Sequence, residues 1–203
     1  MTEHLSKMKL TDIENHLRQF RIGIAGAGGI GSNCAMALAR CGVGELVIAD
    51  NDYVEESNLS RQYYFTDQTG MSKCKAIKNN LERANNKVRV TTCHIQLDKK
   101  NIPDIFAGCN AIVEALDRPE MKEMLIEAVQ TRMPGIPVVV CSGMSGWGHN
   151  ELIKCRKIDD TLFICGDELT EADEDLPPMA PRVGIVANMQ ANVVVEILMK
   201  LKR

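Results

Sequence analysis

A glycine-rich turn constrains the fold of this chain more than any other feature. Gly26, Gly28 and Gly31 are spaced as G-x-G-x-x-G, directly after the apolar segment 21–25 and directly before a helical pattern. In such a unit the first glycine permits a tight turn, the second lets a phosphate approach the backbone, and the third lets strand and helix pack closely. The N–H groups at the start of the following helix favour an anion. The sequence therefore predicts a nucleotide site at this turn.

Strand-like and helix-like segments alternate along the first two thirds of the chain. The expected strands are residues 21–25, 45–49, 87–95, 111–115 and 137–141, and the expected helices are 30–41, 71–84 and 119–132. Several strands are almost continuously apolar, which is typical of a parallel sheet covered on both faces. Gly42 and Gly44 are expected to end the first of these helices. We therefore expect an α/β fold with a Rossmann-like, doubly wound and mostly parallel sheet.

The pattern changes in the last quarter of the chain. Residues 151–156 and 161–165 are short strand candidates separated by the four residues 157–160, which predicts an antiparallel hairpin. Residues 166–182 are acidic and rich in proline, so we expect a mobile loop without regular structure. Residues 183–201 have the pattern of a long amphipathic helix that closes the fold.

The length favours a single domain. The chain has 203 residues, which is within the range of one domain with additional elements. We expect one nucleotide-binding domain over residues 1–203. Its expected parts are an N-terminal helix (1–20, with the amphipathic pattern over 2–19), a Rossmann-like core (21–150), and the hairpin, mobile loop and closing helix (151–203).

Charge and hydropathy argue against several classes of function. The formal net charge is −3, whereas a general nucleic-acid-binding surface needs a basic excess. No apolar run approaches the roughly 18 to 20 residues of a membrane span, and the first ten residues lack the apolar stretch of a secretory signal. We therefore expect a cytoplasmic protein that binds neither membrane nor nucleic acid and whose mature chain starts at residue 1.

The eight cysteines do not have the spacing of a zinc site. No two of them form a C-x-x-C pair, which is the usual spacing of structural zinc ligands. In a reducing compartment the thiols stay free, and free cysteines are usually small buried apolar residues. Zinc is therefore not expected.

The glycine turn alone does not decide between a dinucleotide and ATP. Asp50, at the end of the second expected strand, is placed to bind a ribose hydroxyl in either case. A dinucleotide fold does not need the long polar loop 51–62 that follows. A triphosphate needs donors beyond the adenosine site, and Asn58, Arg61 and Lys73 can supply them, the arginine as a planar fork and the lysine as a point charge.

Specific strings occur at four places: GAGGIGS at 26–32, DNDYVEESNLSRQ at 50–62, GMSK at 70–73 and ALD at 115–117. With these strings the chain resembles the ThiF/MoeB/ubiquitin-activating family of adenylyltransferases over residues 18–143. The stretch MAPRVGIVANMQANVVVEIL at 179–198 is similar to the helix that closes that fold. The nearest subgroup is the short ThiF-like proteins of bacterial thiamine biosynthesis.

The resemblance implies an enzyme that uses ATP and Mg²⁺ to activate the C-terminal Gly-Gly carboxylate of a ThiS-like, ubiquitin-fold sulfur carrier. That carboxylate is itself the nucleophile, so no Ser–His or Cys–His pair is needed. Cations must offset the repulsion between carboxylate and triphosphate. The implied catalytic residues are Asp117, which positions Mg²⁺, with Arg61 and Lys73 on the phosphates. The implied nucleotide-binding residues are Gly26, Gly28, Gly29, Gly31, Asp50 (on the ribose), Asp52, Asn58, Arg61, Gln62 (supporting the loop) and Lys73.

The resemblance also implies a homodimer in which an arginine near the N-terminus reaches the ATP of the partner subunit. Arg18 and Arg21 are the candidates, and Arg18 is preferred because Arg21 lies where the first expected strand starts. Some relatives carry a cysteine in the loop before the last helix, which accepts the activated carrier or a sulfur. The loop 166–182 has none, and Cys165 just before it is the one candidate. We therefore predict adenylylation without an enzyme–carrier thioester. Asp117 is alternatively a helix cap, and Asp52 a turn residue.

Three alternatives stay open. An NAD(P)-dependent oxidoreductase meets the same glycine and aspartate requirements. A nucleotide-sensing or scaffold protein could keep the fold without the chemistry, although it has no need of Arg61, Lys73 and Asp117 together. A protein of this fold could also act on another carrier, or on tRNA in threonylcarbamoyladenosine dehydration, which the net charge of −3 does not favour.

Overall fold

The computed structural model describes residues 8–201 and contains a seven-stranded sheet in the order β3-β2-β1-β4-β5-β7-β6. Neighbouring strands are parallel except β6 and β7, which are antiparallel. The strands are β1 (Arg21–Ala25), β2 (Glu45–Asp50), β3 (Arg89–His94), β4 (Ala111–Glu114), β5 (Val138–Cys141), β6 (Lys154–Lys157) and β7 (Leu162–Gly166). The predicted Rossmann-like sheet with a C-terminal antiparallel hairpin is confirmed.

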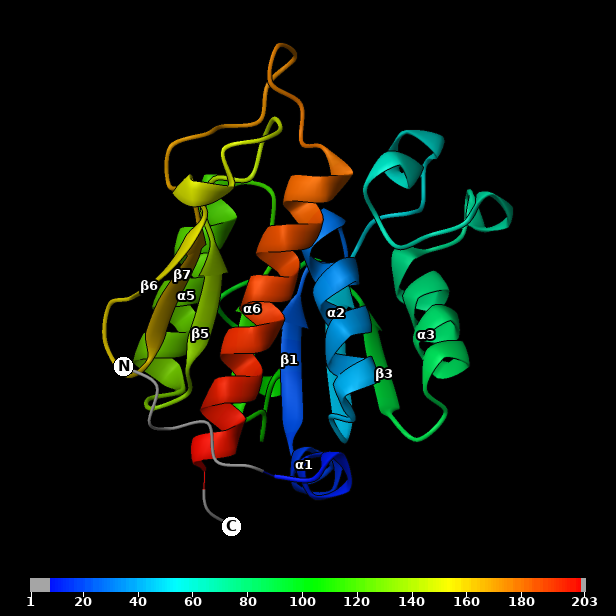
Figure 1. Ribbon diagram of the computed structural model, residues 1–203. Helices are drawn as coiled ribbons and strands as arrows, with labels where there is room; N and C mark the ends of the chain where they lie inside the picture. The colour runs from blue at the N-terminus through cyan, green and yellow to red at the C-terminus, as the bar shows by residue number, and fades with distance from the viewer. Residues whose placement is uncertain (1–7, 202–203) are drawn as a thin grey trace.

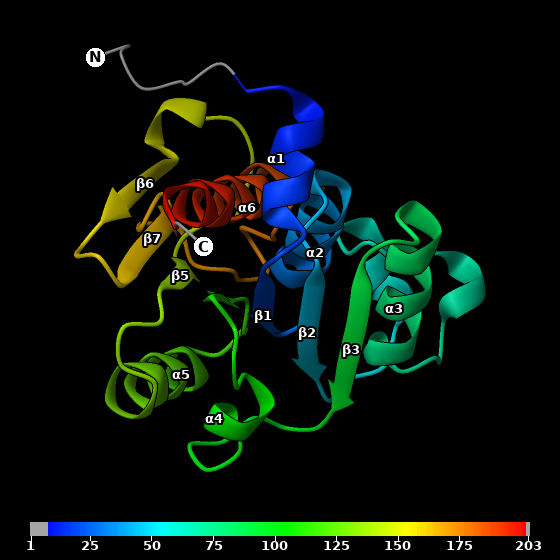
Figure 2. The same ribbon diagram turned by 90° about the horizontal axis from the view of Figure 1, so that it is seen from below.

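Helices cover both faces of the sheet (Figures 1 and 2). Helices α1, α2, α3 and α6 lie on one face, and α4 and α5 lie on the other. Their bounds are α1 (Leu10–Leu17), α2 (Gly29–Cys41), α3 (Lys73–Ala84), α4 (Ile102–Ile105), α5 (Pro119–Arg132) and α6 (Ala180–Lys200). Three 3₁₀ turns complete the fold: η1 (Glu56–Ser60), η2 (Thr66–Gln68) and η3 (Asn150–Leu152). Two apolar clusters fill the space on either side of the sheet, which explains the nearly continuous apolar strands.

The strand order reverses between β1 and β4. Strand β1 leads through α2 to β2 and then through α3 to β3, whereas β4 lies on the other side of β1. The glycine turn follows β1, and residues 115–117 follow β4. In open α/β sheets, ligands bind at the carboxyl ends of the strands where the order reverses. The fold therefore places the two motifs at one ligand-binding position.

Helix ends follow local chemistry. Gly42 ends α2 in the left-handed conformation, with φ of +88°, and its N–H donates to Ala39 O, as predicted. Helix α6 begins at Ala180, three residues before the predicted 183. The prediction treats Pro181 as a residue that excludes regular structure, but proline suits the first helical turn because its missing N–H has no intrahelical acceptor there.

Other predicted boundaries need correction. The first hairpin strand does not start at residue 151, because Asn150–Leu152 form a 3₁₀ turn and β6 spans Lys154–Lys157. The short helix α4 is not part of the prediction. Of the predicted N-terminal helix 2–19, the structure shows α1 over Leu10–Leu17, and residues 2–7 lie outside the described residues.

Helix α6 is long and apolar enough to cross a membrane, judged by length and composition alone. Here it packs against α2 and the sheet, with Val183, Val186 and Val194 fully buried. Buried Gln190 donates from Nε2 to Glu114 O at 3.0 Å and to Val139 O at 2.9 Å. These contacts are those of a core helix that fastens two strands of the sheet.

Candidate nucleotide-binding site

Two glycines of the turn are required by close backbone packing. Gly26 has φ of +99°, a conformation that L side chains rarely adopt, and a Cβ there would lie 2.5 Å from Ala115 O. A Cβ on Gly31 would lie 1.9 Å from Gly26 O. The turn therefore packs directly against the end of β4 and the start of α2, as expected of the first and third glycines of the motif.

The two middle glycines have more space. A Cβ on Gly28 would have one neighbour within 4 Å, Gln62 Nε2 at 3.9 Å. A Cβ on Gly29 would lie 3.1 Å from Val183 Cγ1 and 3.8 Å from Arg61 Cγ. Gly28 immediately precedes α2, and the first N–H groups of an α-helix have no intrahelical acceptor. An anion therefore has access to this backbone, beside Arg61 and Gln62.

Asp50 connects the glycine turn to the polar loop after β2. Its Oδ2 accepts a hydrogen bond from Ala27 N at 2.7 Å, and its Oδ1 accepts one from Asp52 N at 2.7 Å. The carboxylate therefore fixes the turn as well as the start of the loop. Each oxygen keeps a second lone pair, which is available to a ribose hydroxyl.

Side chains from α2 and the loop hold Arg61 against the turn. Asn33 Nδ2 donates to Gly29 O at 2.7 Å and to Arg61 O at 3.0 Å, and Tyr64 Oη donates to Ala27 O at 2.6 Å. The guanidinium of Arg61 donates from Nη1 to Ser57 O at 3.2 Å. Asn33 and Tyr64 are not among the predicted site residues. Both lie in or beside the motif strings, but their partners become evident only in the folded chain.

Lys73 and Asp52 form an ion pair. Lys73 Nζ lies 2.8 Å from Asp52 Oδ2, and the lysine side chain is 7% exposed whereas the aspartate side chain is 56% exposed. Asn58 is directed into its own loop, where Oδ1 accepts from Glu55 N at 3.3 Å and Nδ2 donates to Ser57 Oγ at 3.3 Å. The predicted phosphate ligands thus start from different states: Lys73 is neutralised by Asp52, and Asn58 stabilises the loop.

Asp117 lies on the other side of the switch point from α2. Its residue is exposed, and no hydrogen bond or ion pair of its side chain occurs within residues 8–201. It does not cap α5, because the N-cap is Arg118 and no side-chain cap bond forms. Gly26 packs against Ala115, because a Cβ added at Gly26 would lie close to Ala115 O. Asp117 follows Ala115 by two residues, so it lies near the glycine turn. Its carboxylate is therefore available to a ligand near the glycine turn.

A buried carboxylate that is not among the predicted site residues ends strand β4. Glu114 is fully buried, and Lys122 Nζ lies 2.9 Å from both of its carboxylate oxygens. Leu116 N also donates to Glu114 Oε1, at 2.7 Å. Burial raises the pKa of Glu114, while Lys122 and the backbone N–H donors oppose that shift. A lone acidic residue in an otherwise apolar strand was the available signal.

A second buried ion pair holds both ends of the predicted loop 166–182. Asp167 and Arg182 are in direct contact, with side chains 0% and 3% exposed, and Arg182 Nη1 donates to Gly148 O at 2.7 Å. Burial raises the pKa of Asp167, but hydrogen bonds from Thr170 and Leu169 outweigh it, and the pKa lies below its usual value. The loop is therefore fastened at its base, and its two ends are ordered by this pair.

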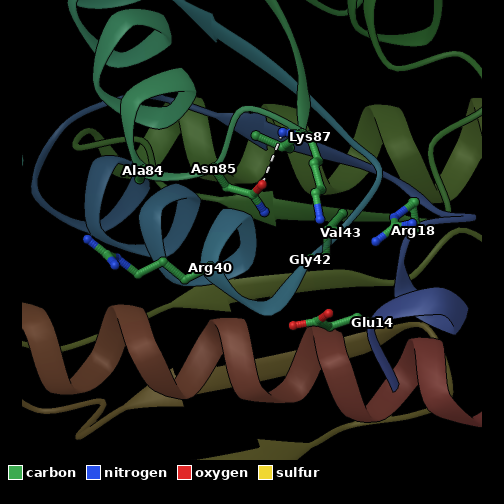
Figure 3. A pocket seen from close by; sticks show the side chains of 9 residues that line it. Glu14, Arg18, Arg40, Gly42, Val43, Ala84, Asn85 and Lys87 are labelled. Atoms are coloured by element: carbon green, nitrogen blue, oxygen red, sulfur yellow. Dashed lines mark hydrogen bonds between the residues drawn. The ribbon is translucent and has the colours of Figure 1, made fainter. Parts of the chain in front are cut away.

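Two cavities of the structure are lined by residues outside the glycine turn. One of about 300 Å³ is lined by Glu14, Arg18, Arg40, Gly42, Val43, Ala84, Asn85, Lys87 and Val88 (Figure 3). Another, of about 450 Å³, is lined by Asp67, Gln68, Met71, Asn79, Glu82 and Arg83. Gly42 and Val43 precede β2, so the first cavity lies at the amino ends of the strands, whereas the glycine turn follows the carboxyl end of β1. Arg18 is thus far from its own chain's site, and its contact with a partner's ATP stays a prediction.

The structure offers no ready-made metal centre among residues 8–201, where no three His, Cys, Asp or Glu side chains gather as ligands. Mg²⁺ characteristically uses one or two protein carboxylates together with phosphate oxygens, and Asp117 suits that arrangement.

Cys165 is fully buried in β7, and burial raises the pKa of its thiol. A thiol in that state is a poor nucleophile for an external carrier.

The fold and the site define a class: an α/β protein with a Rossmann-like sheet and an anion-accessible glycine turn at its switch point. A sequence profile of the ThiF family matches residues 4–203, and the chain belongs to this family. The family predicted from the four strings is confirmed.

Curated relatives match this chain over part of their length. Adenylyltransferase and sulfurtransferase UBA4 from Saccharomyces cerevisiae (strain YJM789) is 35% identical over 143 residues, which are 70% of this chain and 32% of that protein. SAMP-activating enzyme E1 from Haloferax volcanii is 35% identical over 127 residues, which are 62% of this chain and 46% of that protein. The chain therefore matches about a third to a half of the length of these relatives.

Solved structures share the fold. E. coli tRNA N6-threonylcarbamoyladenosine dehydratase TcdA, in complex with ATP, superposes with a TM-score of 0.83 at 19% identity, covering 93% of this chain and 89% of that chain. E. coli MccB, with MccA-N7isoASN, gives a TM-score of 0.70 at 22% identity, covering 93% and 59%. At these identities the likeness shows a common architecture.

Proposed function

We propose that this chain is an ATP-dependent adenylyltransferase that activates the C-terminal Gly-Gly carboxylate of a small, ThiS-like sulfur carrier, as in thiamine biosynthesis. The observation that carries the proposal is the accessible Gly28–Gly29 backbone with Arg61 held beside it. Asp117 is available at the adjoining strand end, two residues beyond the contact of Gly26 with Ala115. Relatives named as an adenylyltransferase and as an activating enzyme support the same chemistry.

The residues of the site fit a nucleoside triphosphate. A Cβ at Gly28 would occupy the space that a phosphate needs, and the orphaned Oε1 of Gln62 is buried beside it without a hydrogen-bond partner among residues 8–201. A buried acceptor without a donor is costly, and a hydroxyl or amino group of a nucleotide would satisfy it. In the proposal Asp50 binds the ribose, and Arg61 and Lys73 bind phosphate oxygens.

The proposed reaction needs positioning and charge neutralisation. A carboxylate oxygen of the carrier attacks the α-phosphorus, the bond from that phosphorus to the bridging oxygen breaks, and pyrophosphate leaves with the electron pair. No proton has to move. Arg61 and Lys73 offset the negative charge that both reactants bring together. Asp117 would hold Mg²⁺, which supplies further positive charge on the phosphates.

The proposed carrier docks at the β6–β7 hairpin and the loop that precedes α6. Leu169 in that loop is 74% exposed and Trp147 in the neighbouring loop is 68% exposed, which offers apolar contact to a protein partner. We also propose that the protein acts as a homodimer in the cytoplasm. All eight thiols are free in the structure, which suits a reducing compartment.

The test is carrier-dependent exchange between ATP and labelled pyrophosphate. Asp117→Ala should abolish exchange and leave the thermal unfolding midpoint unchanged, because the side chain is exposed and forms no hydrogen bond or ion pair with residues 8–201. Asp104→Ala, which removes an exposed aspartate from α4 on the other face of the sheet, is the matched control and should keep full exchange. Full exchange in Asp117→Ala would refute the role of Asp117.

Two further measurements separate the alternatives. Titration with NADH and with ATP–Mg²⁺ tests the oxidoreductase, which requires tight NADH binding and no ATP binding. Incubation with ATP and either a ThiS-like carrier or tRNA, followed by intact-mass analysis, distinguishes the substrates. A carrier mass increased by an adenylyl group supports the proposal, and turnover with tRNA alone overturns it.

A further inference from the structure

Three cysteines lie in one row across the C-terminal part of the sheet. Cys141 on β5 pairs with Cys165 on β7, and Cys165 pairs in turn with Cys155 on β6. Residues directly opposite one another in neighbouring strands point to the same face of the sheet. Cys141 and Cys165 are buried, whereas Cys155 is exposed on the edge strand. The row therefore connects one accessible thiol to two enclosed ones.

The hairpin register places Cys155 and Cys165 at disulfide distance. Ile158 N donates to Leu162 O at 2.9 Å where the hairpin closes. Hydrogen-bonded and non-hydrogen-bonded pairs alternate along an antiparallel ladder, so counting back from this pair makes Cys155 and Cys165 a non-hydrogen-bonded pair. Such pairs have Cα atoms about 4.5 Å apart, and disulfides span Cα separations of about 4.4 to 6.8 Å. The strands need not move for the bond to form.

We propose that Cys155 and Cys165 form a thiol–disulfide exchange site that reacts with small-molecule disulfides such as oxidised glutathione. The Cys155 thiolate attacks one sulfur of the reagent, its S–S bond breaks, and one glutathione thiolate leaves. Cys165 then loses its proton to solvent and attacks Sγ of Cys155, which releases the second glutathione. The two protein thiols are oxidised to one disulfide, and the reagent is reduced to two thiols.

The different surroundings of the two thiols set the order of these steps. Cys155 is on the surface, so the external reagent reaches it first. Cys165 is fully buried, and both burial and its contact with the Cys155 thiol raise its pKa. It therefore does not compete for the external reagent, and it acts on a disulfide that has already formed at its neighbour.

The disulfide would stiffen a functional part of the fold. It would join edge strand β6 to β7, and β7 leads within two residues of Cys165 to Asp167 of the buried ion pair with Arg182. The chemistry of the cysteine pair does not depend on the proposed adenylyltransferase activity. Failure of one proposal therefore leaves the other intact.

The test is oxidation of the full reduced chain by oxidised glutathione, read by thiol titration, intact mass and peptide mapping. We expect the loss of two of the eight free thiols, a mass lower by two hydrogen atoms, and one crosslinked peptide that joins Cys155 to Cys165. The thermal unfolding midpoint should rise by roughly 5 to 10 °C, because a crosslink restricts the unfolded chain.

Two serine variants make the test specific. Cys155→Ser should eliminate the internal disulfide and the rise in midpoint. Cys41→Ser removes another exposed thiol, at the end of helix α2 and outside the hairpin, and should leave both intact. A glutathione adduct that persists on Cys155, a crosslink between another pair, or an internal disulfide that survives in Cys155→Ser would overturn the proposal.

Discussion

The glycine turn allows a sharp test, because its glycines differ in what surrounds them in this structure. Gly26→Ala places a methyl group 2.5 Å from a backbone carbonyl oxygen and forces an L side chain to φ of +99°. The strained backbone costs about 1 to 3 kcal/mol, and the overpacking costs about 1 to 3 kcal/mol more. With about 4 kcal/mol in total, the unfolding midpoint of a chain of this size should fall by roughly 8 to 16 °C.

Gly28→Ala should change the unfolding midpoint little and should weaken ATP binding strongly. Its added methyl group has one neighbour within 4 Å, at 3.9 Å. The main cost is the poorer N-cap, at most about 1 kcal/mol, so the midpoint should fall by no more than roughly 4 °C. If a backbone N–H of this turn binds a phosphate, displacing the phosphate forfeits a hydrogen bond to a charged group worth about 1.5 to 3 kcal/mol. ATP affinity should then fall roughly 10- to 150-fold.

The assay is thermal unfolding followed by circular dichroism, together with calorimetric titration of ATP–Mg²⁺ into each variant. Wild-type ATP affinity in Gly28→Ala would refute the placement of the phosphate at this backbone. A fall in midpoint as large as that of Gly26→Ala would refute the distinction between a packing glycine and a ligand glycine.

The two buried ion pairs at the carboxyl ends of β4 and β7 should both contribute less to stability as pH falls, because each depends on an ionised carboxylate. The pKa of Asp167 is lower in the folded protein than in the unfolded chain. The stability that its carboxylate contributes is therefore present above the unfolded pKa and is lost as pH falls through the folded pKa. Asp167→Asn should lower the unfolding midpoint at neutral pH, and its difference from wild type should shrink in acid. A deficit that is constant with pH would contradict this. Lys122→Met leaves the buried Glu114 carboxylate unpaired and should cost about 3 to 5 kcal/mol at neutral pH. Because burial already raises the pKa of Glu114, the deficit should narrow as pH falls and the carboxyl takes up its proton, and a deficit that widens in acid would show that Glu114 is not the charged partner.

The fold was predictable because its signals are local. Strands β1, β4 and β5 are apolar except for Arg21 and Glu114, and the glycine turn fixes where the first strand ends and the helix begins. The start of α6 could not be predicted from the sequence, because proline is unfavourable inside a helix but suits its first turn. Whether Pro181 precedes the helix or lies in its first turn depends on where the helix begins in the folded chain.

The site was predictable only in part, because some of its contacts join residues that are far apart in the sequence. The motif strings locate Asp50, Arg61 and Asp117, but nothing local shows that Arg182 will meet Asp167, fifteen residues earlier, inside the core. Arg182 lies in a string that was recognised for its family likeness, yet its partner lies in a loop that looks polar and irregular. The burial of Asp167 and Arg182 strengthens their ion pair, and burial is a property of the folded chain that the sequence does not show.

The ion pair of Lys73 limits how the proposed triphosphate can enter. Lys73 is almost fully buried, and its carboxylate partner within residues 8–201 is Asp52. A buried lysine without a counter-charge is costly, and the ion pair with Asp52 holds the Lys73 side chain in place before a ligand arrives. A phosphate that binds Lys73 would bring negative charge next to Asp52, and the two would repel each other. Because the Asp52 side chain is more than half exposed, it can turn into solvent at little cost, whereas Lys73 cannot. The ion pair therefore favours a mechanism in which a phosphate replaces the Asp52 carboxylate as the partner of Lys73, while the lysine side chain keeps its position.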